Sequence, residues 1–165
     1  MTGGAGFLGS HMVDYLLSKG YEVLVLDDFS SGFRENLSCT ERVKILESDV
    51  RNYEVLERCM GGCDKVFHFA AYHPNTVGHI IRQSTIDPAR DASTTIIGTI
   101  NVLEAARRNK SKVVFASSAA VYGEPTEVPV KEEVSATPVS PYGVSKYAAE
   151  TYCTFYHKRY GLPVS

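Results

Sequence analysis

The sequence predicts an α/β fold in which helices cover both faces of a doubly wound parallel sheet. Short apolar runs rich in β-branched residues alternate along the chain with segments of helical periodicity. The apolar runs are continuous, which is typical of parallel strands buried on both faces. A glycine-rich stretch leads into the first helix, and sheets of this kind hold ligands at that point. The length of 165 residues fits one domain.

The first element is a glycine loop with the sequence TGGAGFLGS, in which glycine recurs at every third position: Gly3, Gly6 and Gly9. One glycine would allow a tight turn, one a close approach to a pyrophosphate, and one close packing of helix on strand. The next helix is predicted over residues 10–19, and its first N–H groups would face the phosphates. The alternative is a plain turn with no ligand.

The other elements follow in order. The apolar runs predict strands over 22–26, 43–46, 65–69 and 113–115. Helical spacing predicts helices over 53–60, 88–108 and 141–160, with Pro88 and Pro141 in their first turns and Gly161 at the end of the last. The stretches 28–38, 72–86 and 117–140 are predicted to be irregular, and 162–165 to lead into a further strand.

Composition limits the classes of partner. The net charge of −2 argues against nucleic acid and anionic membranes, and no run is long enough to span a membrane. Met1 is not followed by a signal peptide, so we expect a cytoplasmic protein. The four cysteines and five histidines show no metal-ligand spacing. We therefore expect no metal site, reduced thiols, and histidines on helix surfaces or in loops.

Two acidic positions end expected strands. Asp27 lies 18 residues after Gly9, where a carboxylate can accept hydrogen bonds from the adenosine ribose and would repel a 2′-phosphate. This favours NAD over NADP, although Arg34 in the following loop could soften the preference. Asp49 and Val50 end the next strand and could border the adenine. The alternatives are a helix-cap or loop aspartate at 27 and a turn aspartate at 49.

A tyrosine and a lysine stand four residues apart on the last predicted helix and so share a face: Tyr142 and Lys146. A lysine ammonium beside a phenol would lower the pKa of the tyrosine, which could then act as general base on a sugar hydroxyl. Ser118 follows a strand in the sequence SSAAVYG and could share a hydrogen bond with that hydroxyl. The alternatives are an ordinary helix face and a serine that only caps a loop.

Together these motifs resemble the extended short-chain dehydrogenase/reductase family of nucleotide-sugar epimerases and dehydratases. The resemblance rests on TGGAGFLGSH, LDDFSSG, VFHFAA, IIGTINVLEAAR, SSAAVYGE and SPYGVSK, in the order of the family. It is closest to the N-terminal, cofactor-binding half of the UDP-glucose 4-epimerases. It implies a Rossmann-type NAD-binding domain over residues 1–165.

The resemblance also implies roles for individual residues. Ser118 matches the catalytic serine, Tyr142 the base, and Lys146 its partner, which also contacts the nicotinamide ribose. The cofactor-binding positions it implies are Gly3, Gly6, Phe7, Leu8 and Gly9 at the phosphates, Asp27 at the ribose, Asp49 and Val50 at the adenine, Phe69, Ala70 and Ala71 along the wall of the site, and Tyr142 and Lys146.

Three departures from the family pattern matter. Thr95 stands where the family has asparagine, and the stretch 73–84 matches poorly. Ala119 and Ala120 replace the Asp-Glu pair that serves as acid and base in the 4,6-dehydratases. The resemblance therefore implies a homodimeric 4-epimerase of a nucleotide-diphosphate sugar. Alternatives are a uronate epimerase, decarboxylase or reductase of the same family, or a non-catalytic dinucleotide-binding module.

The ends of the chain lead to a further expectation. A dinucleotide-binding loop follows a buried strand, but only Met1 and Thr2 precede these glycines. We expect a fragment that lacks the first strand and a C-terminal substrate domain. An empty lane would then separate the strands at 22–26 and 43–47 from those at 65–69 and 112–116, unless the two halves close up with altered pairing. Such a chain should be inactive alone and bind NAD poorly.

Overall fold

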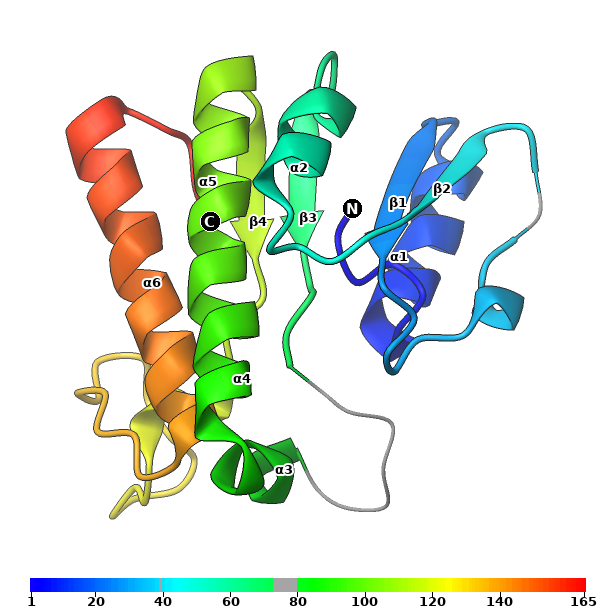
Figure 1. The fold of residues 1–165 in the computed structure, drawn as a ribbon. Coiled ribbons are helices and arrows are strands. Elements are labelled where there is room, and N and C mark those ends of the chain that lie inside the picture. Colours follow the sequence, from blue (N-terminus) through cyan, green and yellow to red (C-terminus); the bar gives the residue numbers. More distant parts are fainter. Residues whose placement is uncertain (39, 73–79) are drawn as a thin grey trace.

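Parallel strands form the middle layer of the protein, a computed structural model that describes residues 1–38, 40–72 and 80–165 (Figure 1). β1 (Val23–Asp27) pairs with β2 (Val43–Glu47), and β3 (Lys65–His68) pairs with β4 (Lys112–Phe115). The four predicted strands are confirmed, with bounds that differ by one residue at both ends of β1 and at one end of each of the others. Val164 forms a further parallel bridge with Val113, as expected of residues 162–165.

The first residues of the chain join the two strand pairs. Thr2 forms parallel bridges with Leu26 of β1 and with His68 of β3. The Gly3 N–H donates to the Leu26 carbonyl at 2.9 Å, and the Thr2 N–H donates to the Phe67 carbonyl at 3.0 Å. The prediction of an empty lane is therefore wrong at the carboxyl ends of the strands. A few residues suffice there, because sheet pairing needs only backbone donors and acceptors.

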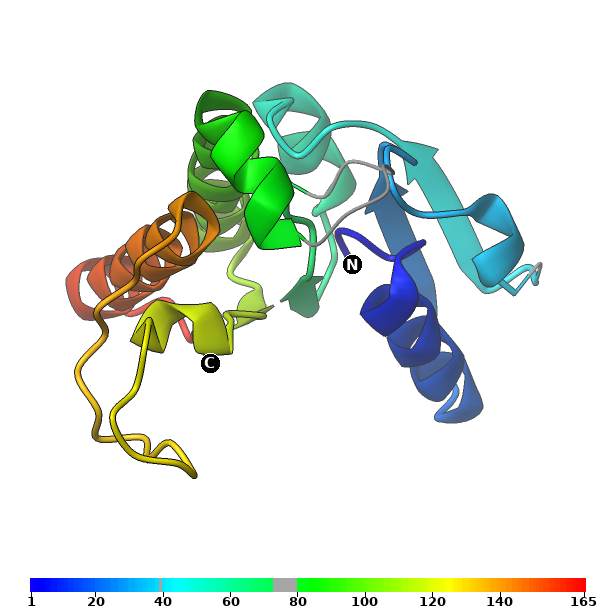
Figure 2. The same cartoon turned by 90° about the horizontal axis from the view of Figure 1, so that it is seen from below.

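Helices cover both faces of this sheet (Figure 2). α1 lies on one face, and α2, α5 and α6 lie on the other. The helical segments are α1 (Phe7–Ser18), η1 (Arg34–Asn36), α2 (Tyr53–Cys59), α3 (Ile80–Ile86), α4 (Pro88–Ala92), η2 (Ser93–Ile97), α5 (Gly98–Asn109), η3 (Ala119–Tyr122) and α6 (Pro141–Tyr160). The doubly wound α/β architecture is thereby confirmed.

Three helical predictions need correction. α1 begins at Phe7, three residues before the predicted start, because Gly6 is its N-cap and Gly9 is already helical. The prediction of an irregular stretch over 72–86 is wrong for 80–86, which form α3, whereas 73–79 lie outside the described residues. The predicted helix over 88–108 is helical throughout but contains a π-helical turn, η2, which apolar spacing alone does not reveal.

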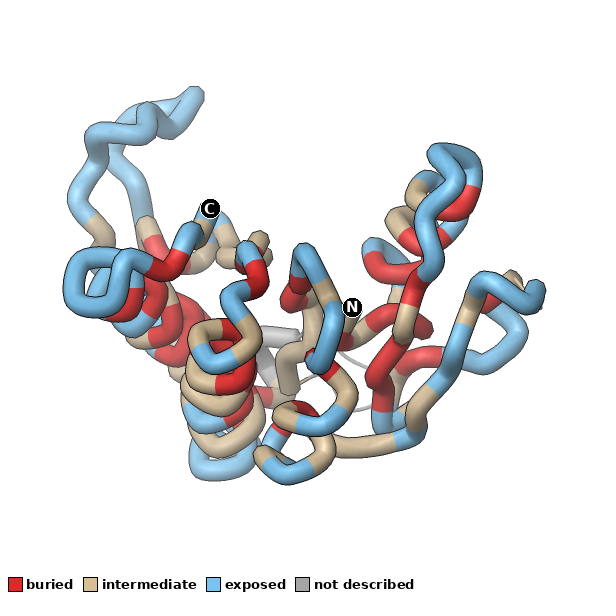
Figure 3. The backbone as a smooth tube through the Cα atoms, turned by 90° about the horizontal axis from the view of Figure 1, so that it is seen from above, coloured by how far each residue is buried: buried red, intermediate tan, exposed pale blue. Residues whose placement is uncertain are grey.

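Two clusters of buried residues hold the layers together. Figure 3 marks the buried positions along the backbone in red. The larger packs the sheet against α2, α5 and α6 and includes Leu26, Leu56, Val102 and Leu103. The smaller packs β1 against α1 through Val13, Leu17, Val23 and Val25. Because both clusters are close-packed and include residues of the strands, they make the carboxyl ends of the strands a rigid base for a binding site.

His68 lies in the middle of this core, with none of its surface exposed. Its Nε2 lies 2.9 Å from the Thr99 hydroxyl, which itself donates to a backbone carbonyl, so Nε2 carries the proton. Nδ1 then accepts from the Thr2 hydroxyl at 2.6 Å. Burial lowers the pKa of His68 to about 3, so the ring is neutral. The prediction that histidines occupy surfaces or loops is wrong here, because both ring nitrogens find partners inside.

No helix in residues 1–38, 40–72 and 80–165 is long and apolar enough to cross a bilayer. In the same ranges, no group of three or more His, Cys, Asp or Glu side chains could hold a metal ion.

Candidate functional site

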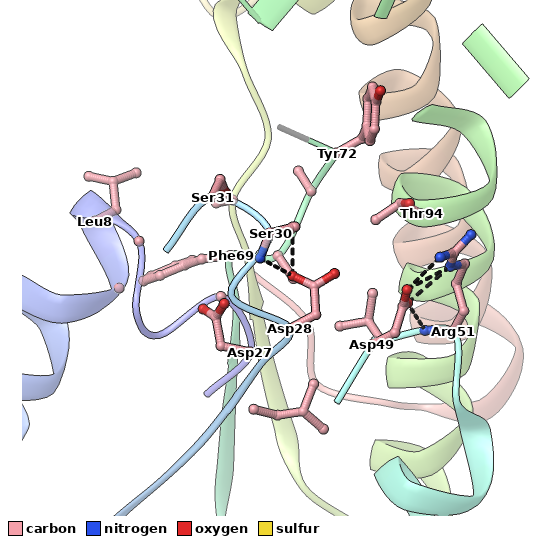
Figure 4. A pocket seen from close by; sticks show the side chains of 18 of the residues that line it. Leu8, Asp27, Asp28, Ser30, Ser31, Asp49, Arg51, Phe69, Tyr72 and Thr94 are labelled. Atoms are coloured by element: carbon pink, nitrogen blue, oxygen red, sulfur yellow. Dashed lines mark hydrogen bonds and ion pairs between the residues drawn. The ribbon is translucent and has the colours of Figure 1, made fainter. Parts of the chain in front are cut away.

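A pocket of about 540 Å³ opens at the carboxyl ends of the strands, between the glycine loop and the start of α6. Figure 4 shows side chains from the strand ends, the loop after β1 and the helical run pointing into it. Every predicted cofactor-binding residue lines this pocket: Gly3, Gly6, Phe7, Leu8, Gly9, Asp27, Asp49, Val50, Phe69, Ala70, Ala71, Tyr142 and Lys146. Strand ends and helix starts meet at one edge of a parallel sheet, which explains this convergence.

The three spaced glycines have different surroundings. Gly3 has a φ of +68°, and a Cβ there would lie 2.6 Å from the Ala70 backbone nitrogen. A Cβ on Gly9 would lie 2.1 Å from the Gly3 carbonyl oxygen. A Cβ on Gly6 would meet only that same oxygen, at an ordinary 3.5 Å. The fold itself therefore requires glycine at positions 3 and 9 but not at 6, where the free space belongs to the pocket.

The start of α1 lacks a side-chain cap. Asn52, Asp87 and Ser140 cap α2, α4 and α6 by accepting hydrogen bonds from backbone N–H groups. The N-cap of α1 is Gly6, which has no side chain to do so, and no acidic residue lies in the first turn. The partial positive charge of this twelve-residue helix is thus left for an anion in the pocket.

Asp27 faces the glycine loop from the end of β1. One carboxylate oxygen accepts from the Ala5 N–H and the other from the Phe29 N–H, both at 2.9 Å. Burial raises the pKa of Asp27, and these two hydrogen bonds oppose the rise. Each oxygen keeps a second lone pair for a hydroxyl group. Arg34 instead forms an ion pair with Glu47 and is not among the residues that line the pocket.

Asp49, at the turn after β2, has a partner that the sequence analysis did not identify. The Arg51 guanidinium contacts it at 2.5 Å, and the Arg51 backbone N–H donates to it at 2.8 Å. This hydrogen bonding holds the pKa of Asp49 below its usual range. Arg51 and Arg90 also line the pocket, so two guanidinium groups flank this end of it.

Two of the predicted catalytic residues, Tyr142 and Lys146, line the opposite end of the pocket from the first turns of α6, whereas the third, Ser118, is not among the residues that line it. Burial raises the pKa of the Tyr142 phenol, and the neighbouring Ser118 hydroxyl opposes this rise to a smaller extent. The Lys146 amino group donates to the Ala116 carbonyl at 2.8 Å and lies 6.0 Å from the Tyr142 ring centroid. The predicted lowering of the Tyr142 pKa by Lys146 is therefore wrong in this structure.

Several other residues that line the pocket were not singled out from the sequence: Asp28, Ser30, Ser31, Tyr72, Arg90, Thr94 and Ser117. Ser117 differs from the rest. Among the described residues its hydroxyl is the one buried side-chain polar atom without a hydrogen-bond partner. A buried hydroxyl without a partner costs free energy, and a ligand in the pocket can satisfy it. Its position directly before Ser118 in the SSAAVYG sequence is the feature from which Ser117 could have been predicted as a site residue.

Comparison with known proteins places this site in a family. A family model described as GDP-mannose 4,6 dehydratase matches residues 1–165. The chain belongs to this family. A curated family relative, UDP-glucose 4-epimerase from Lacticaseibacillus casei, is 37% identical over 165 residues, which are 98% of this chain and 47% of the relative. The chain spans about half the length of the curated relatives it matches.

Two solved structures in the family share the fold. UDP-glucose 4-epimerase from Thermotoga maritima, solved with UDP-glucose, has a TM-score of 0.89 and 39% identity, over 99% of this chain and 52% of that one. The Thermus thermophilus UDP-glucose 4-epimerase, solved as a complex with NAD, has the same TM-score and identity, over 99% of this chain and 51% of that one. The sequence-based assignment to the extended short-chain dehydrogenase/reductase family is confirmed.

Proposed function

We propose that this chain is the NAD-binding domain of a nucleotide-sugar 4-epimerase whose substrate is a nucleotide-diphosphate sugar. The observation that carries the proposal is the convergence of the glycine loop, Asp27 and the Tyr142–Lys146 pair on one pocket. The loop, with the uncapped start of α1, suits a pyrophosphate, and Tyr142 suits proton transfer at the opposite end. The chain alone is proposed to be inactive, because it spans half the length of its relatives.

The residues present fit NAD. The open space beside Gly6 accommodates a pyrophosphate, and Asp27 has lone pairs for the ribose hydroxyls. Ser117 offers a hydroxyl without a partner in the same pocket. NAD would supply the acceptor for the hydride removed from the sugar. The chain itself would bind the phosphates and the ribose, and it would provide the general base that transfers the proton.

Tyr142 is the proposed base, with Ser118 as its hydrogen-bonding partner. Because burial raises the Tyr142 pKa, the phenol can lose its proton near neutral pH only if a nearby positive charge offsets that rise. Lys146 is the proposed source of that charge, although in this structure its amino group lies 6.0 Å from the ring centroid and does not lower the pKa of Tyr142. Deprotonation of the C4 hydroxyl would then accompany hydride loss from the same carbon, and the reverse steps on the other face would give the epimer.

The family model bears the name of a dehydratase, so the type of reaction needs its own argument. Water loss needs an acid and a base close to the sugar, in addition to Tyr142. Ala119 and Ala120 occupy η3, directly after Ser118, and neither side chain can donate or accept a proton. This supports epimerisation. Family members that act as uronate epimerases, decarboxylases or reductases are alternatives, and so is a non-catalytic dinucleotide-binding role.

A homodimer is proposed on the exposed surface of the long helices. Val144, Tyr147 and Phe155 recur on one side of α6 and are 50%, 43% and 47% exposed, and Ile97 at the end of η2 is 49% exposed. Such an apolar stripe suits pairing of the 88–108 and 141–160 helices across a two-fold axis. We expect a protein of the relatives' length with this chain as its N-terminal half to be dimeric at micromolar concentration, and Tyr147→Glu to shift it to monomer, measured by analytical ultracentrifugation. A monomeric unmodified protein of that length contradicts the proposal.

The cofactor assignment is tested at Asp27, in a protein of the relatives' length with this chain as its N-terminal half. NAD should bind more tightly than NADP, and Asp27→Ala should weaken NAD binding roughly 10- to 100-fold, because charged hydrogen bonds to the ribose are lost. Asp27→Asn keeps the shape of the side chain and removes its charge, so it should reduce the difference between the affinities for NAD and NADP. Calorimetric titration with both cofactors gives the affinities. Equal or tighter NADP binding by the unmodified protein would overturn the assignment.

A further inference from the structure

Asp91 is a fully buried carboxylate on α4, with no surface exposed to solvent. It does not line the pocket, and none of the roles proposed above uses it. Aspartate is seldom buried completely unless it is paired and hydrogen-bonded, because the charged form is costly away from water. Its environment therefore indicates what it does.

Two hydroxyl groups from different elements donate to this carboxylate. Ser145 of α6 donates to Oδ2 at 2.7 Å, and Thr95 of the π-helical turn η2 donates to Oδ1 at 3.2 Å. Thr95 also accepts a hydrogen bond from the Tyr72 backbone N–H at 3.4 Å, beside the pocket wall. Ser145 directly precedes Lys146. Asp91 thus ties α4 and the π-helical turn to α6, one residue away from the lysine.

Asp91 and Lys146 also interact electrostatically. Lys146 is only 2% exposed, and burial lowers its pKa to about 8. Asp91 exerts the largest of the influences that raise the Lys146 pKa, followed by Cys153 and Glu150 of α6. Burial raises the pKa of Asp91, and the hydrogen bonds from Ser145 and Thr95 and the charge of Lys146 oppose this rise. The Lys146 charge also adds to the effect of burial in lowering the pKa of His68 on β3. Tyr142 of α6 also faces Asp91, which raises the pKa of the phenol.

We propose that Asp91 is a positioning residue for the Tyr142–Lys146 pair: its buried carboxylate holds α6 through Ser145 and supplies the negative charge that keeps the Lys146 amino group protonated. Asp91 acts through Lys146, because it does not reach the pocket itself. The assignment rests on the proposed function, which gives Tyr142 and Lys146 their roles. It goes beyond that function by explaining how a lysine buried this deeply retains its charge near neutral pH.

The test is an NMR titration of the Lys146 side chain in the protein labelled with isotope at lysine. Asp91→Asn keeps the size and the acceptor oxygen but removes the charge. We expect the Lys146 pKa to fall by about one unit or more from its value near 8. Ser145→Ala is the matched control, because it removes a hydrogen bond and leaves the charge, and it should keep the Lys146 pKa near 8. An unchanged pKa in folded Asp91→Asn overturns the proposal.

A reciprocal measurement covers the case in which Asp91→Asn does not fold. The coupling between two groups must be equal in both directions. Lys146→Met should therefore raise the pKa of Asp91, measured from the carboxyl carbon chemical shift, and an unchanged Asp91 pKa contradicts the proposal. Neither titration needs cofactor or substrate. The Asp91 proposal can thus fail while NAD binding and epimerisation stand, and it can hold where those assignments fail.

Discussion

Tyr142→Phe should lower the turnover of the epimerase roughly 100- to 10,000-fold, which is the range for the loss of a general acid–base group. The ring remains, so its contacts at the start of α6 and the wall of the pocket are retained. NAD affinity should therefore change far less than turnover. The measurements are steady-state kinetics and calorimetric NAD titration on a protein of the relatives' length that contains this chain.

Tyr152→Phe is the matched control for this change. Tyr152 lies on the same helix, is 38% exposed and does not line the pocket. Removal of its hydroxyl should leave turnover within a factor of about two, as expected for a surface change remote from the chemistry. Near-normal turnover of Tyr142→Phe would show that another group takes the proton, and the proposed role of Tyr142 would have to be abandoned.

Elements with strong start and stop signals could be predicted closely from the sequence. α6 runs from Pro141 to Tyr160 as predicted, because Ser140 caps its start, proline suits its first turn, and Gly161 adopts the left-handed conformation at its end. The sequence of α3 offers no comparable start and stop signals. It is only seven residues long and contains three isoleucine residues and a threonine, which are weak helix formers.

The pocket could be predicted in position but not in its electrostatics. Residues at the ends of strands must meet at one edge of a parallel sheet, so the spacing of Asp27, Asp49 and Phe69 is enough to place them together. The pKa of Tyr142 was predicted in the wrong direction, because the sequence shows that Lys146 is one turn away but not how deeply the phenol is buried. Asp91 was missed because its partners lie 4 and 54 residues away.

The pairing made by Thr2 marks a different limit of sequence reasoning. Strands are recognised by runs of apolar side chains, and two residues cannot form such a run. Hydrogen bonding to β1 and β3 uses only the backbone, so Thr2 and its neighbours pair with both strands without that pattern. The same pairing fixes the start of the glycine loop. Substitutions of the loop glycines can therefore distinguish an effect on the stability of the fold from an effect on ligand binding.

Gly6→Ala and Gly9→Ala should separate the two reasons for glycine in this loop. A methyl group at position 9 would lie 2.1 Å from the Gly3 carbonyl oxygen and 2.6 Å from the Gly4 Cα, so backbone must shift. We expect Gly9→Ala to lower the free energy of unfolding by about 1–3 kcal/mol, as overpacking does. At position 6 the nearest atom would lie 3.5 Å away, and the φ of −75° suits alanine. Gly6→Ala should cost about 1 kcal/mol or less.

Gly6→Ala should affect cofactor affinity strongly, although it should affect stability only weakly. The methyl group of Gly6→Ala would occupy the space from which a pyrophosphate approaches α1, so NAD affinity should fall at least about tenfold in a protein that remains folded. Urea denaturation of this chain gives the two stabilities, and calorimetry on the longer protein gives the affinities. If Gly6→Ala binds NAD as tightly as the unmodified protein, the phosphates do not lie against Gly6. If Gly9→Ala is as stable as Gly6→Ala, the loop can relax and its geometry is not what demands glycine at position 9.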